Sequence, residues 1–397
     1  TMRADGASNF AANRKWGVFP AAAVRWNISR ENFLAGVSWL DDLSLRASIG
    51  RSGNDAIGTY MSQSTLTSDK GVWMLGDYRP IAYYDTRLSN GNLTWETTDS
   101  YNVGLNFVAF GERVNLEVDA YQSNTSDLLL AMKTNQSTGY DTYFTNMGST
   151  RNRGIEATLT TRNIVSKKFS WSTMLTVSHN DQRVIDAGED RLVPTYVNFR
   201  NTTQPLYGYR AGYPLNSLWG YQYAGVWHSK DEIERNKITK TYVSSGSSQL
   251  GISRFVDQNN DGLLDQNDLV YQGNSDPVLY GGFQNNFTIG NLSLKIFATW
   301  SLGGKIYNIS EILAGSGSRA YNKYRFMLNS WDPELNPDSD IPRAGKEDYN
   351  ASDRMIYDAS YVRLKEVSLS YRFNIAKNWC KSIVVGASGE NLLLWKR

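Results

Sequence analysis

A strict alternation of apolar and polar residues constrains this chain more than any other feature. Leu43, Leu45, Ala47 and Ile49 are apolar, whereas the residues between them are polar or small. Successive side chains of a β-strand point to opposite faces, so such a segment predicts a strand with two unlike faces. The pattern recurs in about ten segments, near residues 18–26, 43–49, 101–107, 114–120, 155–159, 171–177, 283–289, 292–300, 367–371 and 383–387. The chain is therefore expected to be all-β.

The connections between these segments alternate between short and long. The short ones lie around residues 29–42, 109–113, 163–168, 290–291 and 374–381. The long ones are rich in Gly, Asn, Asp and Ser and run over residues 51–100, 124–152, 180–277 and 302–360. Short turns at one end and long loops at the other are typical of outer-membrane barrels, whose turns face the periplasm and whose loops face outward.

The strand lengths also suit a membrane, because a tilted strand needs about 9–11 residues to span a bilayer. No apolar run is long enough for a spanning helix. Aromatic residues gather near the short turns and are candidates for an interfacial girdle: Trp26, Phe107, Phe110, Phe169, Trp171, Phe287, Phe373 and Trp379. They could equally be core aromatics of a soluble β-protein, a class in which such one-sided long loops are unusual.

Alternation further predicts which residues face lipid and which face the barrel lumen. The lipid-facing set comprises Leu45, Leu105, Leu116, Leu159, Leu294 and Leu369. The lumen-facing set comprises Arg46, Asn106, Glu117, Glu156, Lys295 and Ser370.

Charge and residue counts remove several function classes. A net charge of +2, from 41 basic and 39 acidic residues, provides no field of one sign for nucleic acid. A single cysteine, Cys380, excludes an intramolecular disulfide framework. The two histidines, His179 and His228, belong to no metalloprotease motif, and neither a nucleophile elbow nor a phosphate-binding glycine loop is present. We therefore do not expect an enzyme.

Several segments together resemble the SusC/RagA-like TonB-dependent outer-membrane transporters. They are residues 3–10 (RADGASNF), Phe19 and Pro20 with Trp26, 43–54 (LSLRASIGRSGN), 93–97 (LTWET), 146–148 (NMG) with 152–156 (NRGIE), 361–366 (YVRLKE), and Asn391 with Leu392. Each motif is weak alone, but they follow one another in the order found in that family and extend over nearly the whole chain.

The resemblance implies an antiparallel barrel of roughly 22 strands closed by an N-terminal plug. Residues 1–397 would then be the C-terminal part of one barrel domain, with the plug, the TonB box and the last strand outside this sequence. The family resemblance further implies active import of glycans or peptides across the outer membrane of a Gram-negative bacterium, in contact with its lipid. TonB and a SusD-like surface lipoprotein would be the partners. A passive porin or a surface-binding barrel is the alternative.

One loop has the residue spacing of a calcium site. Oxygen-bearing side chains alternate before a glycine, and a carboxylate stands at the twelfth position, as in EF-hand loops. Ca²⁺ prefers such oxygen ligands. The expected ligands are Asp257, Asn259, Asp261, the Leu263 carbonyl, Asp265 and Asp268. The alternative is a loop whose Asx turns cap their own backbone.

Aromatic residues in the long loops are candidates for substrate contact. An aromatic face can stack on a sugar ring or hold a peptide side chain, although the same residues can simply pack the loops together. The candidates are Trp73, Tyr78, Tyr83, Tyr84, Trp219 and Tyr221. Nothing in these residues separates an oligosaccharide from a peptide.

Overall fold

The computed structural model describes most of the chain. The described residues are 1–11, 13–70, 76, 81–85, 87–134, 136–140, 142–188, 192–199, 202–235, 250–315, 322–345, 352–377 and 380–396. None of the helices within these ranges has the length and apolar character needed to cross a membrane.

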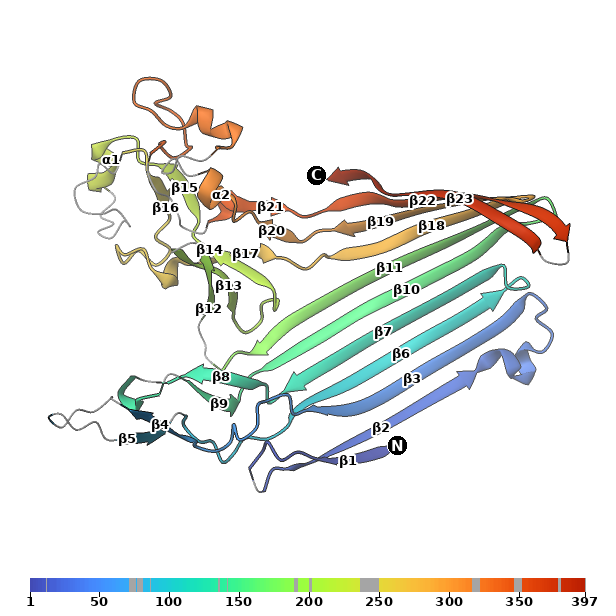
Figure 1. Ribbon diagram of the computed structural model, residues 1–397, viewed down its shortest axis with the longest axis horizontal. Helices are drawn as coiled ribbons and strands as arrows, with labels where there is room; N and C mark the ends of the chain where they lie inside the picture. The colour runs from blue at the N-terminus through green and yellow to red at the C-terminus, as the bar shows by residue number, and fades with distance from the viewer. Residues whose placement is uncertain are drawn as a thin grey trace. The chain divides into compact units, whose positions relative to one another are not determined.

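One sheet of 11 strands dominates the fold, and Figure 1 shows its strands lying side by side. From β1 to β18 each strand pairs antiparallel with the next strand of the sheet, and the sheet strands follow one another in chain order once the loop strands are left out. The strands are β1 (Met2–Gly6), β2 (Trp16–Asn27), β3 (Leu40–Asn54), β6 (Glu96–Ala109), β7 (Val114–Ser126), β10 (Ser149–Val165), β11 (Phe169–Asp186), β18 (Leu279–Ile289), β19 (Leu292–Leu302), β22 (Tyr361–Lys377) and β23 (Cys380–Lys396).

Smaller elements occupy the connections. The paired strands are β4 (Leu66–Lys70) with β5 (Ile81–Asp85), β8 (Leu129–Lys133) with β9 (Thr142–Asn146), β15 (Tyr223–Val226) with β16 (Ser253–Phe255), and β20 (Lys305–Tyr307) with β21 (Ile356–Asp358). A four-stranded sheet comprises β12 (Val193–Phe199), β13 (Thr202–Tyr209), β14 (Ser217–Gly220) and β17 (Val270–Asn274). The α-helices are α1 (Lys230–Arg235) and α2 (Glu311–Ala314), and the 3-10 turns are Ile28–Arg30, Asn32–Leu34, Gln136–Thr138, Gln266–Asp268, Arg325–Asn329 and Asp353–Met355.

The predicted all-β fold and its alternation of short and long connections are confirmed. The ten expected segments correspond to β2, β3, β6, β7, β10, β11, β18, β19, β22 and β23. The additional strand is β1, whose five residues contain too few apolar positions to reveal a period of two. Several strands are longer than a bilayer requires, with 18 residues in β11 and 17 in β10.

On β3, β6, β7 and β10, strand register places the two predicted sets of residues on opposite faces. Leu45 pairs with Leu105, and Leu159 is flanked by Leu116 and Leu175, which produces an apolar outward face. Polar positions alternate with these residues and form the inward face. A one-residue slip in the pairing of two strands would turn every side chain to the opposite face, so the observed register is what assigns each set to its face.

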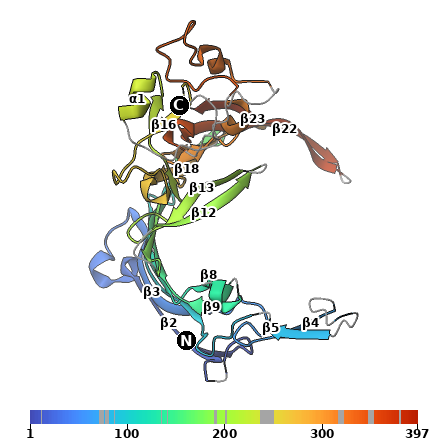
Figure 2. The same cartoon turned by 90° about the vertical axis from the view of Figure 1, so that its left-hand side faces the viewer.

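The residues form two compact units. The first contains residues 1–190, 280–299 and 363–393, and thus most of the 11-stranded sheet together with β4, β5, β8 and β9. The second contains residues 191–279, 300–362 and 394–397, and thus most of the two longest connections. Figure 2 shows the loop strands β4, β5, β8 and β9 of the first unit lying to one side of its sheet.

Motifs that are far apart in the sequence meet in the core of the first unit. Phe10, Phe19, Leu93 and Trp95 are buried together, and Trp95 lies 5.3 Å from each of the two phenylalanine rings. Asn146 accepts a hydrogen bond from Thr94 N and donates one to Thr94 O, both at 2.8 Å. A Cβ at Gly53 would lie 2.1 Å from the Phe19 ring, so this position requires glycine. The motif residues therefore act as one packing unit at the loop ends of the strands.

Candidate functional site

The inward face of the sheet carries ion pairs that span more than one strand. Arg46, Gly104 and Asp119 are aligned across β3, β6 and β7. The Arg46 Nη2 donates to Asp119 Oδ2 and to Glu117 Oε1, each at 2.9 Å. A Cβ at Gly104 would lie 2.6 Å from Asp119 Oδ1 and 2.9 Å from Arg46 Nη2. The missing side chain of Gly104 therefore lets the guanidinium reach across β6.

The same arrangement recurs two strands further along the sheet. Tyr121 on β7 crosses Gly154 on β10, and its hydroxyl donates to Asn180 Oδ1 on β11 at 2.9 Å. Near the other end of the sheet, Lys295 Nζ donates to Glu366 Oε2 at 2.8 Å. Fixed charges and amides thus line the inward face, a surface that water and polar solutes can wet.

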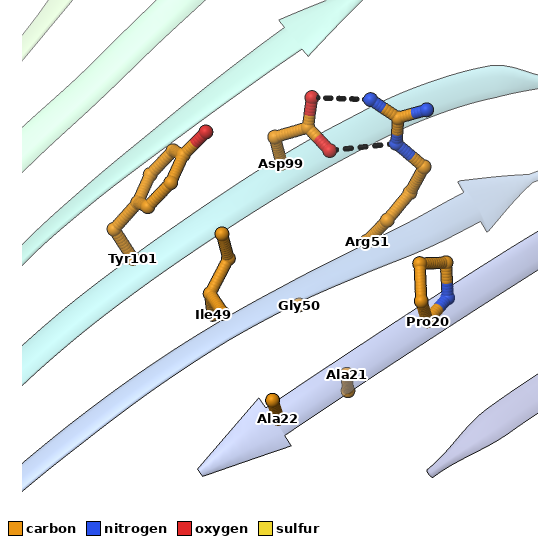
Figure 3. Close-up of a pocket in the computed structure, with 8 residues that line it drawn as sticks. All are labelled: Pro20, Ala21, Ala22, Ile49, Gly50, Arg51, Asp99 and Tyr101. Carbon is orange, nitrogen blue, oxygen red and sulfur yellow. Dashed lines mark hydrogen bonds and ion pairs between the residues drawn. The ribbon is translucent and has the colours of Figure 1, made fainter.

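The outward face has a hollow of about 390 Å³, shown in Figure 3. Pro20 and Ala22 on β2 are small, whereas the neighbouring Ile49 on β3 and Tyr101 on β6 are large, and this difference in size forms the hollow. Figure 3 also shows the adjacent ion pair, in which Arg51 Nε and Nη2 each donate to a carboxylate oxygen of Asp99 at 2.7 Å. The outward-facing residues Ile49 and Tyr101 place the hollow on the lipid side, away from a path through the lumen.

The predicted substrate-contacting aromatics have different environments. Trp73 and Tyr78 lie outside the described residues. Tyr83 and Tyr84 lie on β5, where 70% and 46% of each residue is exposed. Both rings can therefore meet a ligand, and substrate contact at these two positions stays a prediction.

Trp219 and Tyr221 are only 2% and 4% exposed. Trp219 packs against Tyr213 and Tyr271, with ring centroids 5.1 and 5.9 Å away, and its Nε1 donates to Gly208 O at 3.2 Å. Tyr221 packs against Phe255, Leu264 and Leu269. Of the two roles considered for these aromatic residues, substrate contact and loop packing, both Trp219 and Tyr221 have the packing role in this conformation. Neither ring is exposed to a substrate.

In the predicted calcium loop, side-chain oxygens accept hydrogen bonds from the loop's own backbone. Asp257 Oδ2 accepts from Gly262 N at 2.8 Å, and Asp261 Oδ1 accepts from Leu263 N at 2.8 Å. Asn259 Oδ1 accepts from Asp261 N at 3.1 Å. Asp265 caps the 3-10 turn Gln266–Asp268 by accepting from Asn267 N at 2.7 Å. The contacts of Asn259, Asp261 and Asp265 each reach the backbone two residues on and are the Asx turns that the alternative interpretation expects.

Asp268 is fully buried, and its two carboxylate oxygens accept from Gln258 N at 2.8 Å and from Asp265 N at 2.7 Å. Leu264 belongs to the apolar cluster beneath the loop. Among the described residues, no group of three or more His, Cys, Asp or Glu side chains is gathered as metal ligands. Asp257 Oδ1 is buried without a hydrogen-bond partner, and calcium binding by this loop stays a prediction.

In the second unit, the buried carboxylate of Glu311 joins helix α2 to strand β21. Glu311 is 3% exposed, and its Oε1 accepts hydrogen bonds from the Tyr357 hydroxyl and, at 3.0 Å, from Asn308 Nδ2. Burial of the phenol, with smaller contributions from the hydrogen bond to Glu311 and from its charge, raises the pKa of Tyr357 to about 12. The pair thus links the 3-residue strand β21 to helix α2.

Sequence reasoning located the lumen-facing charges but missed their partners. Arg46, Glu117, Asp119 and Lys295 follow from alternation, whereas the ion pairs of Arg46 with Asp119 and of Lys295 with Glu366 appear only in the folded chain. Alternation could have signalled one further feature that was missed, because Arg151 and Arg153 share the outward parity of Ile155. The outward face is therefore charged at the loop end of β10.

Comparisons with known proteins agree with this architecture. A family model described as TonB dependent receptor-like, beta-barrel, matches residues 1–392. TonB-dependent receptor P3 of Formosa agariphila is 32% identical over 400 residues, covering 99% of this chain and 39% of that protein. TonB-dependent receptor SusC of Bacteroides thetaiotaomicron is 29% identical over 388 residues, covering 94% of this chain and 36% of that protein. The chain thus spans less than half the length of these relatives.

The fold also matches solved structures. The RagAB peptide transporter aligns with 100% of this chain and 42% of its own, with a TM-score of 0.78 and 23% identity. The RagAB peptide importer in its open-open state aligns with 100% of this chain and 41% of its own, with a TM-score of 0.78 and 24% identity. At these identities the likeness shows a shared fold, and the predicted barrel architecture is confirmed.

Proposed function

Because the chain belongs to the TonB-dependent receptor-like β-barrel family of Gram-negative outer membranes, we propose that it forms the barrel wall of a SusC/RagA-type importer. In this role the outward face meets lipid and the inward face lines the route of a polar solute. The solute is an oligosaccharide or a peptide. The family match over residues 1–392 is the observation that carries the proposal.

The polarity of the inward face supports passage of a hydrophilic solute. Arg46 with Asp119 and Lys295 with Glu366 present both signs of charge to the lumen. Mixed charges suit uncharged glycans and zwitterionic peptides better than a lumen of one sign, which would select an ion. The exposed Tyr83 and Tyr84 provide flat surfaces that can hold a sugar ring or an aromatic peptide side chain.

Energy coupling and capture belong to the whole protein, of which this chain is a part. TonB would displace the plug, and a SusD-like surface lipoprotein would close the outward loops over the captured solute. The relatives' names and the RagAB peptide transporter fold support these partners. The loop of residues 257–268 adds a candidate structural Ca²⁺ site, and no catalytic step is proposed.

The test is uptake by cells in which the full-length gene is deleted and then restored. We expect the deletion to abolish growth on one class of nutrient, either defined oligosaccharides or defined peptides, and the intact gene to restore it. A restored strain carrying Arg46→Gln with Asp119→Asn serves to probe the lumen, with Arg162→Gln at a short turn as the matched control. Unchanged growth of the deletion strain on both nutrient classes would overturn the proposal.

A passive porin or a surface-binding barrel is the competing function. Disabling TonB distinguishes them, because an energised importer then stops whereas a diffusion pore continues to conduct. Uptake that is equal with and without functional TonB would establish the passive alternative. Binding of the solute at the cell surface without any uptake would establish a surface-binding barrel.

A further inference from the structure

The outward face of β10 and β11 is apolar in the middle of the strands and charged at the long-loop end. Leu159 pairs with Leu175 and Ala157 with Val177, and both pairs are apolar. Toward the long-loop end the next outward pairs are Ile155 with His179, Arg153 with Asp181, and Arg151 with Arg183. Strands rise about 3.3 Å per residue, so this charged end lies on the order of 20 Å along the strand from Leu159.

The arrangement of charges at this end is unusual for a strand pair. Asp181 accepts from Arg153 Nε at 3.2 Å and from Arg183 Nε at 3.0 Å. Arg151 stands directly opposite Arg183, and like charges in this position destabilise a sheet. The Arg151 Nε is buried and has no hydrogen-bond partner. An anion placed beside the Arg151 guanidinium would offset the repulsion between Arg151 and Arg183.

The strand beside β10 provides no competing carboxylate at this level. The β7 residues opposite Arg153 and Arg151 are Gln122 and Asn124, which are uncharged. On the following strand, Asp99 is opposite Asn124 but is already bound through both oxygens to Arg51, as Figure 3 shows. The Arg51 and Asp99 pair is neutral, whereas at the outward positions of β10 and β11 Asp181 pairs with Arg153 and Arg183 and a third arginine, Arg151, stands opposite Arg183.

We propose that Arg151, Arg153 and Arg183 form a site for a phosphate group on an outer-leaflet lipid. Guanidinium groups bind phosphate through paired hydrogen bonds. The three arginines lie on the outward face, which favours a lipid over a soluble anion. The acyl chains of a bound lipid would run along two apolar pairs, Ala157 with Val177 and Leu159 with Leu175. The position at the long-loop end selects the outer leaflet, where phosphorylated glycolipids present such groups. The lipid would act as an annular anchor that sets the depth of the barrel.

The test measures lipid binding to the full-length protein in detergent by native mass spectrometry. The probes are bis-phosphorylated lipid A, the same glycolipid without its phosphates, and inorganic phosphate. The variants are Arg151→Gln with Arg183→Gln and, as matched control, Arg162→Gln on the same strand near its short turn, where it pairs with the exposed Glu112. Removing each arginine should weaken binding of the phosphorylated probe about fivefold, and the control should bind as the parent does.

Two further measurements separate loss of the site from loss of the fold. The melting temperature of a single Arg151→Gln variant in lipid-free detergent should not fall, because this substitution relieves the like-charge pair and leaves the contact between Arg183 and Asp181 in place. Binding should also weaken as salt rises, since the contact is ionic and partly exposed. Equal affinity of parent and double variant, or equal affinity for the two glycolipids, would overturn the site. Inorganic phosphate that competes at the same concentration as the glycolipid would show that no lipid occupant is selected.

Discussion

Leu159 and Thr158 are neighbours on β10 that differ in the face they occupy. Leu159 lies between Leu116 and Leu175 on the outward side, whereas Thr158 lies opposite Glu117 and Thr176 on the inward side. We expect Leu159→Arg to destabilise the barrel by about 2–4 kcal/mol, because arginine at the membrane midplane loses its hydration. Thr158→Arg should cost much less, since the lumen is polar and Glu117 lies opposite. Refolding titrations of the full-length protein into lipid vesicles would measure both, and equal costs would contradict the assignment of faces.

Tyr357 provides a residue-level test in the second unit. Its pKa of about 12 exceeds the value near 10 of an unfolded tyrosine, so the folded state holds the phenol proton more tightly. The resulting stabilisation is fully present below pH 10 and is lost as the pH rises through about 12. Limited proteolysis near α2 should therefore accelerate over this range.

Tyr357→Phe removes the donor to the buried Glu311 and should accelerate the same cleavage already at neutral pH, since a hydrogen bond to a charged group contributes about 1.5–3 kcal/mol. The variant should also lose the additional acceleration between pH 10 and 12. Tyr209→Phe, at an exposed tyrosine of the same unit, is the control for a general effect of alkali on tyrosines. An identical pH profile in parent and Tyr357→Phe would show that another group titrates.

At the scale of an element, the loop of residues 257–268 has two ways to satisfy its carboxylates. Its hydrogen bonds already cap the backbone, yet three of its acids, Asp257, Asp261 and Asp265, stand within nine residues of one another, and their mutual repulsion would be relieved by a cation. We expect the full-length protein to bind one calcium ion more than the double variant Asp257→Ala, Asp261→Ala. Isothermal titration and metal analysis after dialysis would measure the difference.

The control for that experiment is Asp276→Ala, which removes a carboxylate outside the loop. If calcium binds the loop, millimolar calcium should also raise the resistance of residues 250–278 to proteolysis in the parent and in the control, but not in the double variant. Indistinguishable calcium content in all three proteins would show that the loop is held by its own Asx turns alone.

Across the whole molecule, the sequence predicted features that depend on local pattern and missed those that depend on register. Alternation and connection length predicted ten of the 11 strands of the large sheet and the face occupied by Arg46 and Lys295. The burial of Trp219 could not be predicted, because β14 has only four residues and all four are buried, which leaves no alternation. The opposition of Arg151 and Arg183 likewise requires the pairing of two strands, which composition does not encode.

The surface lipoprotein proposed to cover the outward loops can be tested at the scale of the whole molecule with Tyr83 and Phe110. Tyr83 lies in a long connection and Phe110 in a short turn, with exposed fractions of 70% and 55%. If a surface lipoprotein closes over the long loops, a photo-reactive amino acid at position 83 of the full-length protein should cross-link to it in intact cells. The same group at position 110 faces the other side of the membrane and should give no such product. The proposed lid would be contradicted if neither position cross-linked to the lipoprotein, or if both did so equally. The two residues are similarly exposed, so only a partner bound on the loop side gives a cross-link at position 83 and none at position 110.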